Sequence, residues 1–360
     1  MKIVIFSGGV GAARFLYGMK HANLSNNTDV TIISNTGDDF DWYGLRICPD
    51  IDTVIYHLTE QSGKFGWCIK DDTFNLLNKL SEAKLEDWFH IGDNDLITHL
   101  MRNQILNSGK SLSEATDSLV QFYGCSYKIL PMSNQECPTT ITTTSDETLS
   151  FQEYFAKRKY KDQVKTINYP NNHLVEAAPG VIQSIDDADI IFFPPSNPLL
   201  SIEPILQISS IKKAIIKSSS KKIAISPIIN GKSIKGPLSK ILSELGIENS
   251  IRGIGNYYAD IADTFFIDES DKEDLNLLND IDLHAEVANI LLVDKSLSPK
   301  NLSTVVANIN EELVVKTFVK EKNQSFLTSG SKKLKDKINL TENPEIFIWG
   351  VVTYVIHDLQ

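Results

Sequence analysis

Short, mostly apolar runs separated by helix-length stretches constrain the fold of this chain more than any other feature. The runs are rich in valine and isoleucine, and they lie at residues 3–6, 30–34, 128–130, 190–193, 223–226, 264–267 and 290–293. Between several of them lie segments with a helical pattern, at residues 12–21, 203–217 and 237–245. A strand that is apolar along its whole length is buried on both faces, as in a parallel sheet covered by helices. The pattern therefore predicts an α/β fold with a mostly parallel sheet between layers of helices.

The pattern changes after residue 53, where helical signatures replace strands up to about residue 125. These signatures lie at residues 72–80, 95–107 and 111–123. The last of them opens with Ser111 and Glu114, which are spaced as in a capping box. We interpret residues 54–125 as a helical insertion into the sheet domain. A β-branched run at residues 139–144 predicts a strand of a separate small element.

The length of 360 residues allows one large domain or two modest ones. The extent of the family resemblance given below assigns residues 1–310 to one domain, made of an α/β core (1–53 and 126–310) and the helical insertion. Residues 311–360 remain as a C-terminal extension of unknown role. We expect this extension to add a strand or a helix to the core or to a subunit interface.

The chain is acidic, with 46 Asp and Glu against 35 Lys and Arg and a net charge of -11. Such a chain repels polyphosphate, so we expect no general binding to nucleic acid or to anionic membranes. A phosphorylated ligand would have to be held by helix N-termini, backbone amides and a metal ion rather than by bulk charge.

The ends of the chain and its cysteines indicate a cytoplasmic protein. The first residues lack the apolar core and cleavage site of a secretory signal, and the longest apolar run near the other end, 346–356, has 11 residues, too few to span a bilayer. Four cysteines are spread along the chain without a C-x-x-C pair. We therefore expect buried free thiols rather than a zinc site or a disulfide framework.

A glycine-rich segment, SGGVGAAR at residues 7–14, follows the first predicted strand and opens a helix. Gly8, Gly9 and Gly11 would let the backbone approach a phosphate group that the N-terminus of the helix then holds. The segment matches neither a Walker A sequence nor a full G-x-G-x-x-G. Taken alone, it predicts a phosphate site and a tight strand–helix turn about equally well.

Four aspartates lie within 15 residues of one another after the second predicted strand: Asp38, Asp39, Asp50 and Asp52. An α/β sheet places its ligands at this end of its strands. Carboxylate oxygens at such density suit Mg²⁺ held together with the phosphates of a ligand. The alternative is that some of them cap helices, as Asp50 would for a helix beginning near residue 51.

Three further groups of polar residues are weaker candidates. Asp95, Thr98 and His99 share one face of a predicted helix, and Asp93 stands just before it, although a helix cap and a core or surface histidine explain these residues better. The loops after two later strands carry Ser196 and Asn197, and Asn230. Turn chemistry explains each loop alone, but two rigid polar loops at the ends of successive strands suggest one shared pocket.

Taken together, these blocks resemble the 2-phospho-L-lactate transferase family, which builds the deazaflavin coenzyme F420. The resemblance covers roughly residues 1–310. The matching blocks are, in order, GGVGAARFL, NTGDD, RICPDIDTV, GDNDLITHLMRNQIL, KILPMS, FQEYFAKRK, PPSNPLLSIEPIL and SPIINGKSIKGP. The first and third blocks look most like the bacterial-type branch. One departure is Cys68, which stands where members of the family commonly carry glycine.

The resemblance implies a Rossmann-like three-layer α/β/α fold with a helical insertion and a Mg²⁺-dependent transferase. Such an enzyme moves a phospholactyl, phosphoenolpyruvyl or similar three-carbon phospho-acid group from a GDP-linked donor. The acceptor is the terminal ribityl hydroxyl of the deazaflavin precursor Fo, and GMP is released. The resemblance also suggests a homodimer. An alternative is a non-catalytic regulator of the same superfamily that binds a nucleotide or a sugar nucleotide.

The resemblance also implies roles for individual residues. Asp52, Asp38 and Asp39 would hold Mg²⁺, and Asp52, Asp39 and Asp50 would act in catalysis by clamping the diphosphate and accepting the proton of the acceptor hydroxyl. The residues expected to bind substrate are Gly8, Gly9, Gly11, Asp93, Thr98, His99, Ser196, Asn197 and Asn230.

Overall fold

The computed structural model divides the chain into two compact units. The first comprises Met1–Ile267 and Asp274–Glu286, and the second comprises Asp268–Glu273 and Val287–Gln360. The structure describes all residues except 22–27, 64–65, 170–173, 234–235, 289–290, 295–297, 310–311, 322–323, 329–336, 344–345 and 356–360.

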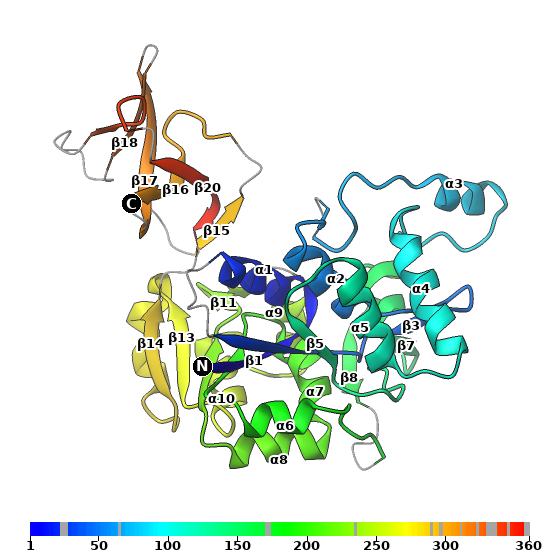
Figure 1. The fold of residues 1–360 in the computed structure, drawn as a ribbon. Coiled ribbons are helices and arrows are strands. Elements are labelled where there is room, and N and C mark those ends of the chain that lie inside the picture. Colours follow the sequence, from blue (N-terminus) through cyan, green and yellow to red (C-terminus); the bar gives the residue numbers. More distant parts are fainter. Residues whose placement is uncertain are drawn as a thin grey trace. The chain divides into compact units, whose positions relative to one another are not determined.

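The first unit is built on a seven-stranded sheet with the strand order β14-β13-β10-β9-β1-β2-β5 (Figure 1). Its strands are β1 (Lys2–Ser7), β2 (Asp29–Ser34), β5 (Lys128–Pro131), β9 (Ile190–Phe193), β10 (Lys221–Ile225), β13 (Thr264–Asp268) and β14 (His284–Ala288). Neighbouring strands from β13 to β5 pair in parallel. The chain moves outward from β1 through β2 to β5, and then returns to the other side of β1 and moves outward through β9, β10 and β13. This reversal beside β1 defines a doubly wound α/β fold, which confirms the predicted fold class.

Helices cover both faces of this sheet. On one face, α1 (Gly9–Lys20), α2 (Pro49–Leu58) and α5 (Leu112–Phe122) bury an aliphatic core against β1 and β2 (Figure 1). On the other face lie α6 (Val181–Asp186), α7 (Glu203–Leu206), α8 (Ser209–Lys217) and α10 (Ile251–Tyr258). There the ring of Phe6 stacks on Phe193 with centroids 5.2 Å apart, and Phe193 contacts Tyr258 at 5.6 Å. The predicted helix at 203–217 is thus two helices, α7 and α8.

The predicted helical insertion contains α3 (Asn75–Glu82), α4 (Asp95–Asn107) and α5. The capping box at Ser111 and Glu114 is present, with both reciprocal hydrogen bonds. The hairpin of β3 (Phe40–Trp42) and β4 (Leu45–Ile47) packs Trp42 and Ile47 against Ile91 in a small aromatic cluster. Helix α2 extends beyond residue 54, the predicted start of the insertion. It belongs to the core, because its residues from Asp50 to Leu58 are buried.

Smaller elements complete the first unit. The predicted strand at 139–144 is β6 (Thr140–Thr143), which pairs with β7 (Thr148–Ser150) and β8 (Val164–Asn168) in a separate three-stranded sheet, as expected. The other short elements are the π-helical turns η1 (Glu153–Lys157) and η2 (Pro198–Ile202), the hairpin of β11 (Ile228–Ile229) and β12 (Lys232–Ser233), and helix α9 (Leu238–Glu244). The 3-10 segment η3 (Glu269–Leu278) begins in the second unit and ends in the first.

The second unit is an antiparallel sheet with the order β15-β20-β16-β17-β18-β19. Its strands are β15 (Leu291–Asp294), β16 (Thr304–Ile309), β17 (Glu312–Glu321), β18 (Gln324–Thr328), β19 (Ile338–Asn339) and β20 (Phe347–Val355). Val305, Ala307, Phe318 and Leu327 form its core.

The second unit therefore begins before the predicted boundary at residue 310. Within the described residues, the extension adds no strand to the first sheet, but completes the second sheet together with β15 and β16. Of the predicted strand at 290–293, residue 290 lies outside the described residues and the rest is in β15, so the edge strand of the first sheet is β14 instead.

Two other expectations concern the cysteines and the membrane. All four cysteines are free thiols, and Cys48, Cys68 and Cys137 are buried, as expected. Over the part of the chain that the structure describes, no helix is both long and apolar enough to cross a membrane.

Candidate active site

The loops after β1 and β9 touch at the point where the strand order reverses. A Cβ atom on Gly8 would lie 2.5 Å from Ser201 Cβ, and one on Gly11 would lie 2.6 Å from the carbonyl oxygen of Pro195. Ser196 Oγ donates to the carbonyl oxygen of Gly8 at 2.9 Å. The glycines are therefore needed for the close approach of two chain segments. Doubly wound sheets bind their ligands in the crevice at this reversal.

The side chain of Asp50, which belongs to α2, lies at the N-terminus of α1, beside the glycine turn formed by residues 8–11. Its Oδ1 accepts the backbone N–H of Gly9 at 2.6 Å, so this amide of the glycine turn already binds a carboxylate. Asp50 does not cap its own helix, α2, because this helix begins at Pro49 and has no side-chain hydrogen bond at its N-cap. The glycine turn thus has the chemistry of an anion site, with an internal anion bound to one of its amides.

Asp38 and Asp50 form a buried pair around Asn35. The amide nitrogen of Asn35 donates to Asp38 Oδ1 at 3.0 Å and to Asp50 Oδ2 at 2.9 Å. Burial raises the pKa of Asp50 to about 6. Burial and the neighbouring Asp50 raise the pKa of Asp38 well above its usual range. Two carboxylates this close cannot both ionise without a compensating charge.

This pair fits a Mg²⁺ ion. Within the described ranges, no three Asp, Glu, His or Cys side chains come together in a way that could hold a metal. Mg²⁺ does not require three, because it is commonly bound by one or two carboxylates while water and substrate phosphates supply the other oxygens. A divalent cation would also neutralise the repulsion that raises the pKa of Asp38. Asp38 and Asp50 are therefore the residues that would hold the metal.

Asp39 lies beside this pair but faces a different partner. Its Oδ2 accepts from Arg46 at 3.1 Å and from the thiol of Cys48 at 3.0 Å. Its Oδ1 is buried and has no hydrogen-bond partner among the described residues. Burial raises the pKa of Asp39 to about 7, although the guanidinium of Arg46 opposes this shift. Asp39 is thus a carboxyl group that can gain or lose a proton near neutral pH.

Asp52 belongs to a buried ion-pair network between α2 and α4. Its Oδ1 accepts from Arg102, whose side chain is completely buried, and its Oδ2 lies 3.7 Å from His99 Nδ1. His99 Nε2 in turn lies 3.5 Å from Asp95 Oδ2. Burial raises the pKa of Asp52, and Arg102 opposes this rise. This geometry gives Asp52 a cationic partner from the protein itself, unlike the Asp38–Asp50 pair.

Thr98 and His99 are both buried, on the face of α4 that the sequence predicts. The hydroxyl of Tyr56 lies within hydrogen-bond distance of Thr98 Oγ1, at 2.6 Å, and of Asp95 Oδ1, at 2.5 Å. The structure therefore brings Thr98 and His99 together with Asp52 and with Asp95, rather than with the glycine turn.

Asp93 lies apart from these clusters. It is half-buried, and it accepts hydrogen bonds from Thr73 Oγ1 at 2.5 Å and from the backbone N–H groups of Asn75 and Leu76 at 2.9 Å each. These bonds lower its pKa to about 2. Asp93 therefore caps α3, not the helix that follows it.

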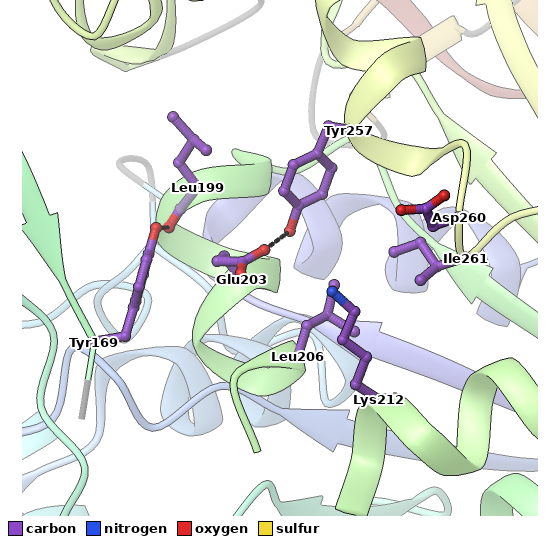
Figure 2. Close-up of a pocket in the computed structure, with 8 residues that line it drawn as sticks. All are labelled: Tyr169, Leu199, Glu203, Leu206, Lys212, Tyr257, Asp260 and Ile261. Atoms are coloured by element: carbon purple, nitrogen blue, oxygen red, sulfur yellow. Dashed lines mark hydrogen bonds between the residues drawn. The ribbon is translucent and has the colours of Figure 1, made fainter. Parts of the chain in front are cut away.

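The two predicted polar loops have separate local roles. Asn197 Oδ1 accepts from the backbone N–H groups of Leu199 and Leu200 at 3.0 and 3.2 Å, which caps the turn η2. Asn230 lies in the turn between β11 and β12 with φ at 48°. A cavity of about 350 Å³ lies behind η2, and Figure 2 shows Tyr169, Glu203 and Tyr257 among the residues that line it. None of the predicted site residues lines this cavity.

Sequence reasoning missed Asn35, Arg46 and Arg102. Asn35 opens the NTGDD block, so its place at the end of a strand was a usable signal. Arg46 and Arg102 are basic residues among acidic ones, but nothing local in the sequence reveals which aspartate each contacts.

The raised pKa values predict that the metal-free protein loses stability as pH rises. Asp50 and Asp39 titrate near 6 and 7 in the folded state and near 3.8 when unfolded, so between these values the folded state binds more protons. The contribution of these two groups to the free energy of unfolding is present at pH 4 and is lost as the pH rises through 6 to 7. Urea unfolding in EDTA should show a lower midpoint at pH 8 than at pH 5.5. An equal or higher midpoint at pH 8 would contradict this assignment.

Comparison with known proteins gives a consistent result for the first unit. The family model described as 2-phospho-L-lactate transferase CofD matches residues 3–310. A phosphoenolpyruvate transferase from Kitasatospora aureofaciens is 33% identical over 317 residues, which cover 85% of this chain and 97% of the relative. A 2-phospho-L-lactate transferase from Methanosarcina mazei is 32% identical over 305 residues, covering 84% of this chain and 99% of the relative.

Two further matches concern the fold and the second unit. The crystal structure of a UPF0052 family protein from Bacillus halodurans matches with a TM-score of 0.55 at 16% identity, covering 82% of this chain and 95% of that one. At this identity the match supports the fold alone. A model described as Peptidase S24-like matches residues 285–353, a span that nearly coincides with the second unit.

Proposed function

This chain belongs to the 2-phospho-L-lactate transferase family, and from that premise we propose that it transfers a phosphorylated three-carbon acid group in the biosynthesis of coenzyme F420. The donor is a GDP-linked phospholactate, phosphoenolpyruvate or related acid, and the acceptor is the ribityl hydroxyl of Fo. The observation that carries the proposal is the Asp38–Asp50 pair, which lies against the glycine turn where the strand order reverses. The proposal includes a homodimer in the cytoplasm, as the family resemblance suggests.

The reaction forms one bond to phosphorus and breaks another. The acceptor oxygen attacks the phosphorus that carries the three-carbon acid, the bond between this phosphorus and the bridging oxygen breaks, and GMP leaves with that oxygen. Phosphoryl transfer of this kind depends on positioning and on charge neutralisation more than on covalent chemistry. When bound, Mg²⁺ supplies positive charge for the diphosphate.

The residues of this chain have three tasks in this reaction. Asp38 and Asp50 would hold the metal next to the glycine turn. The N-terminus of α1 and the turn itself would receive phosphate oxygens. Asp39 would accept the proton of the acceptor hydroxyl, because its pKa of about 7 and its unpartnered Oδ1 suit a general base at neutral pH.

Incubation of the protein with Mg²⁺, Fo and a GDP-linked donor should release one GMP for each Fo consumed. Liquid chromatography with mass spectrometry would measure GMP and the deazaflavin product, and competition between phospholactyl and phosphoenolpyruvyl donors would identify the preferred acid. Omission of Fo is the control for simple hydrolysis of the donor. Absence of product with every three-carbon donor would overturn the proposal. Unchanged deazaflavin fluorescence on titration with the protein would then favour a nucleotide-binding regulator.

A further inference from the structure

The turn η2 (Pro198–Ile202) packs directly against the glycine turn, at the point where the strand order of the sheet reverses. Ser201 packs against Gly8 so closely that a Cβ atom on the glycine would lie 2.8 Å from Ser201 Cα. The carbonyl oxygen of Leu200 accepts from the amide nitrogen of Asn35 at 3.5 Å. A shift of η2 would therefore change its contacts with the glycine turn and with Asn35, the residue that links Asp38 and Asp50.

The other side of η2 is held by two tyrosines from distant parts of the chain. The hydroxyl of Tyr169 donates to the carbonyl oxygen of Leu199 at 2.7 Å. The hydroxyl of Tyr257 lies within donating distance of two acceptors, Glu203 Oε2 at 2.6 Å and the carbonyl oxygen of Pro198 at 3.2 Å. Figure 2 shows Tyr169 and Tyr257 reaching toward this segment from opposite sides, with Glu203 between them.

The surroundings of the Tyr169 and Tyr257 hydroxyls keep both of them protonated. Burial raises the pKa of both phenols, so both stay protonated and keep donating at physiological pH. The cavity of about 350 Å³ that they line lies directly behind η2. The residues of η2 are buried, and the two hydroxyls add to this packing a hydrogen bond from Tyr169 to Leu199 and one from Tyr257 to Glu203 or Pro198.

We propose that Tyr169 and Tyr257 are positioning residues that hold η2 against the glycine turn, and that Glu203 orients Tyr257. Through η2 they set the width of the crevice for the diphosphate of the donor. The identity of this ligand rests on the proposed function. In this role both tyrosines act on the donor through η2, so we expect their replacement to change donor binding and not acceptor binding.

The test compares Tyr169→Phe, Tyr257→Phe and the double variant with Tyr258→Phe. Tyr258 is the matched control, because it neighbours Tyr257 in α10, is completely buried, and has a hydroxyl without a partner among the described residues. Each single variant should raise the KM for the donor by roughly two- to tenfold, as expected for loss of one hydrogen bond. The kcat, the KM for Fo and the melting temperature should stay near wild-type values, and Tyr258→Phe should change none of them.

Calorimetric titration with GDP gives a second measurement that needs no turnover. The double variant should bind GDP more weakly than wild type by the same factor as its KM for the donor rises. An unchanged donor KM and GDP affinity in the double variant, or a change equal to that of Tyr258→Phe, would overturn this role. A wild-type protein that binds GDP but transfers nothing would instead contradict the proposed function, while the GDP comparison would still decide the role of the tyrosines.

Discussion

Replacement of Asp38 by asparagine is expected to lower kcat/KM at least about 100-fold while leaving the protein as stable as wild type at pH 8 or more so. The carboxyl group of Asp38 lies beside Asp50, and its pKa is raised by burial and by the neighbouring negative charges of Asp50 and Asp39. An asparagine resembles the protonated acid, since its amide can donate to Asp50 and its oxygen can accept from Asn35. It removes a carboxylate that would bind Mg²⁺ and keeps the packing.

Steady-state kinetics, calorimetric titration with Mg²⁺ and urea unfolding would test this prediction together. Asp41→Asn is a matched control, because Asp41 lies close to Asp38 in the sequence, in β3, but is exposed. Wild-type Mg²⁺ affinity in Asp38→Asn would refute the metal role of this pair. Loss of activity together with a large loss of stability would also contradict it, because the effect would then be one of folding.

Replacement of Arg102 by methionine should have the largest effect on stability, a loss of about 3–5 kcal/mol in the free energy of unfolding. Arg102 is completely buried and pairs with Asp52. Removal of either partner leaves a charge in the interior without compensation. Asp52→Asn should therefore be destabilising as well, because the guanidinium then has no carboxylate.

The double variant Asp52→Asn with Arg102→Met separates stability from chemistry. Removal of both charges should recover much of the stability that either single variant loses, because a buried ion pair contributes little more than a neutral pair in its place. Urea unfolding would measure this recovery. A double variant that is folded but inactive would support the predicted metal or catalytic role of Asp52. A double variant that is folded and active would show that the role of Asp52 is structural.

The fold of the first unit could be predicted because each central strand carries its own signal. Runs such as residues 3–6 and 190–193 are apolar at nearly every position, which is required of strands between two layers of helices. The second unit was harder to delimit, because its antiparallel strands are half-exposed and the boundary falls before residue 310, within the span that the family match covers. The point where the chain leaves one sheet and enters the next, between β14 and β15, has no periodic pattern in the sequence that would mark it.

The candidate site could be predicted as a set of residue types but not as a set of pairs. Asp38 and Asp50 do lie together at the carboxyl end of β2, with Asp39 beside them, as the position of NTGDD indicates, whereas Asp52 pairs with Arg102 between α2 and α4. Their division into a pair around Asn35, a partner of Arg46 and a partner of Arg102 depends on how α2 lies against α1 and α4. Such contacts join residues up to 50 positions apart, and no local pattern encodes them. The same holds for Asp93, which caps a helix that precedes it in the sequence.

The central place of β1 has a consequence for biosynthesis of the protein on the ribosome. One edge of β1 pairs with β2 early, but its other edge waits for β9, which begins at Ile190. At roughly 5–20 residues per second, translation needs about 10–40 s to supply that strand. During this interval a buried apolar strand has an open edge, and the glycine turn has no η2 to close against. Chains truncated before Ile190 should accordingly aggregate, and the crevice is among the last parts of the first unit to be completed.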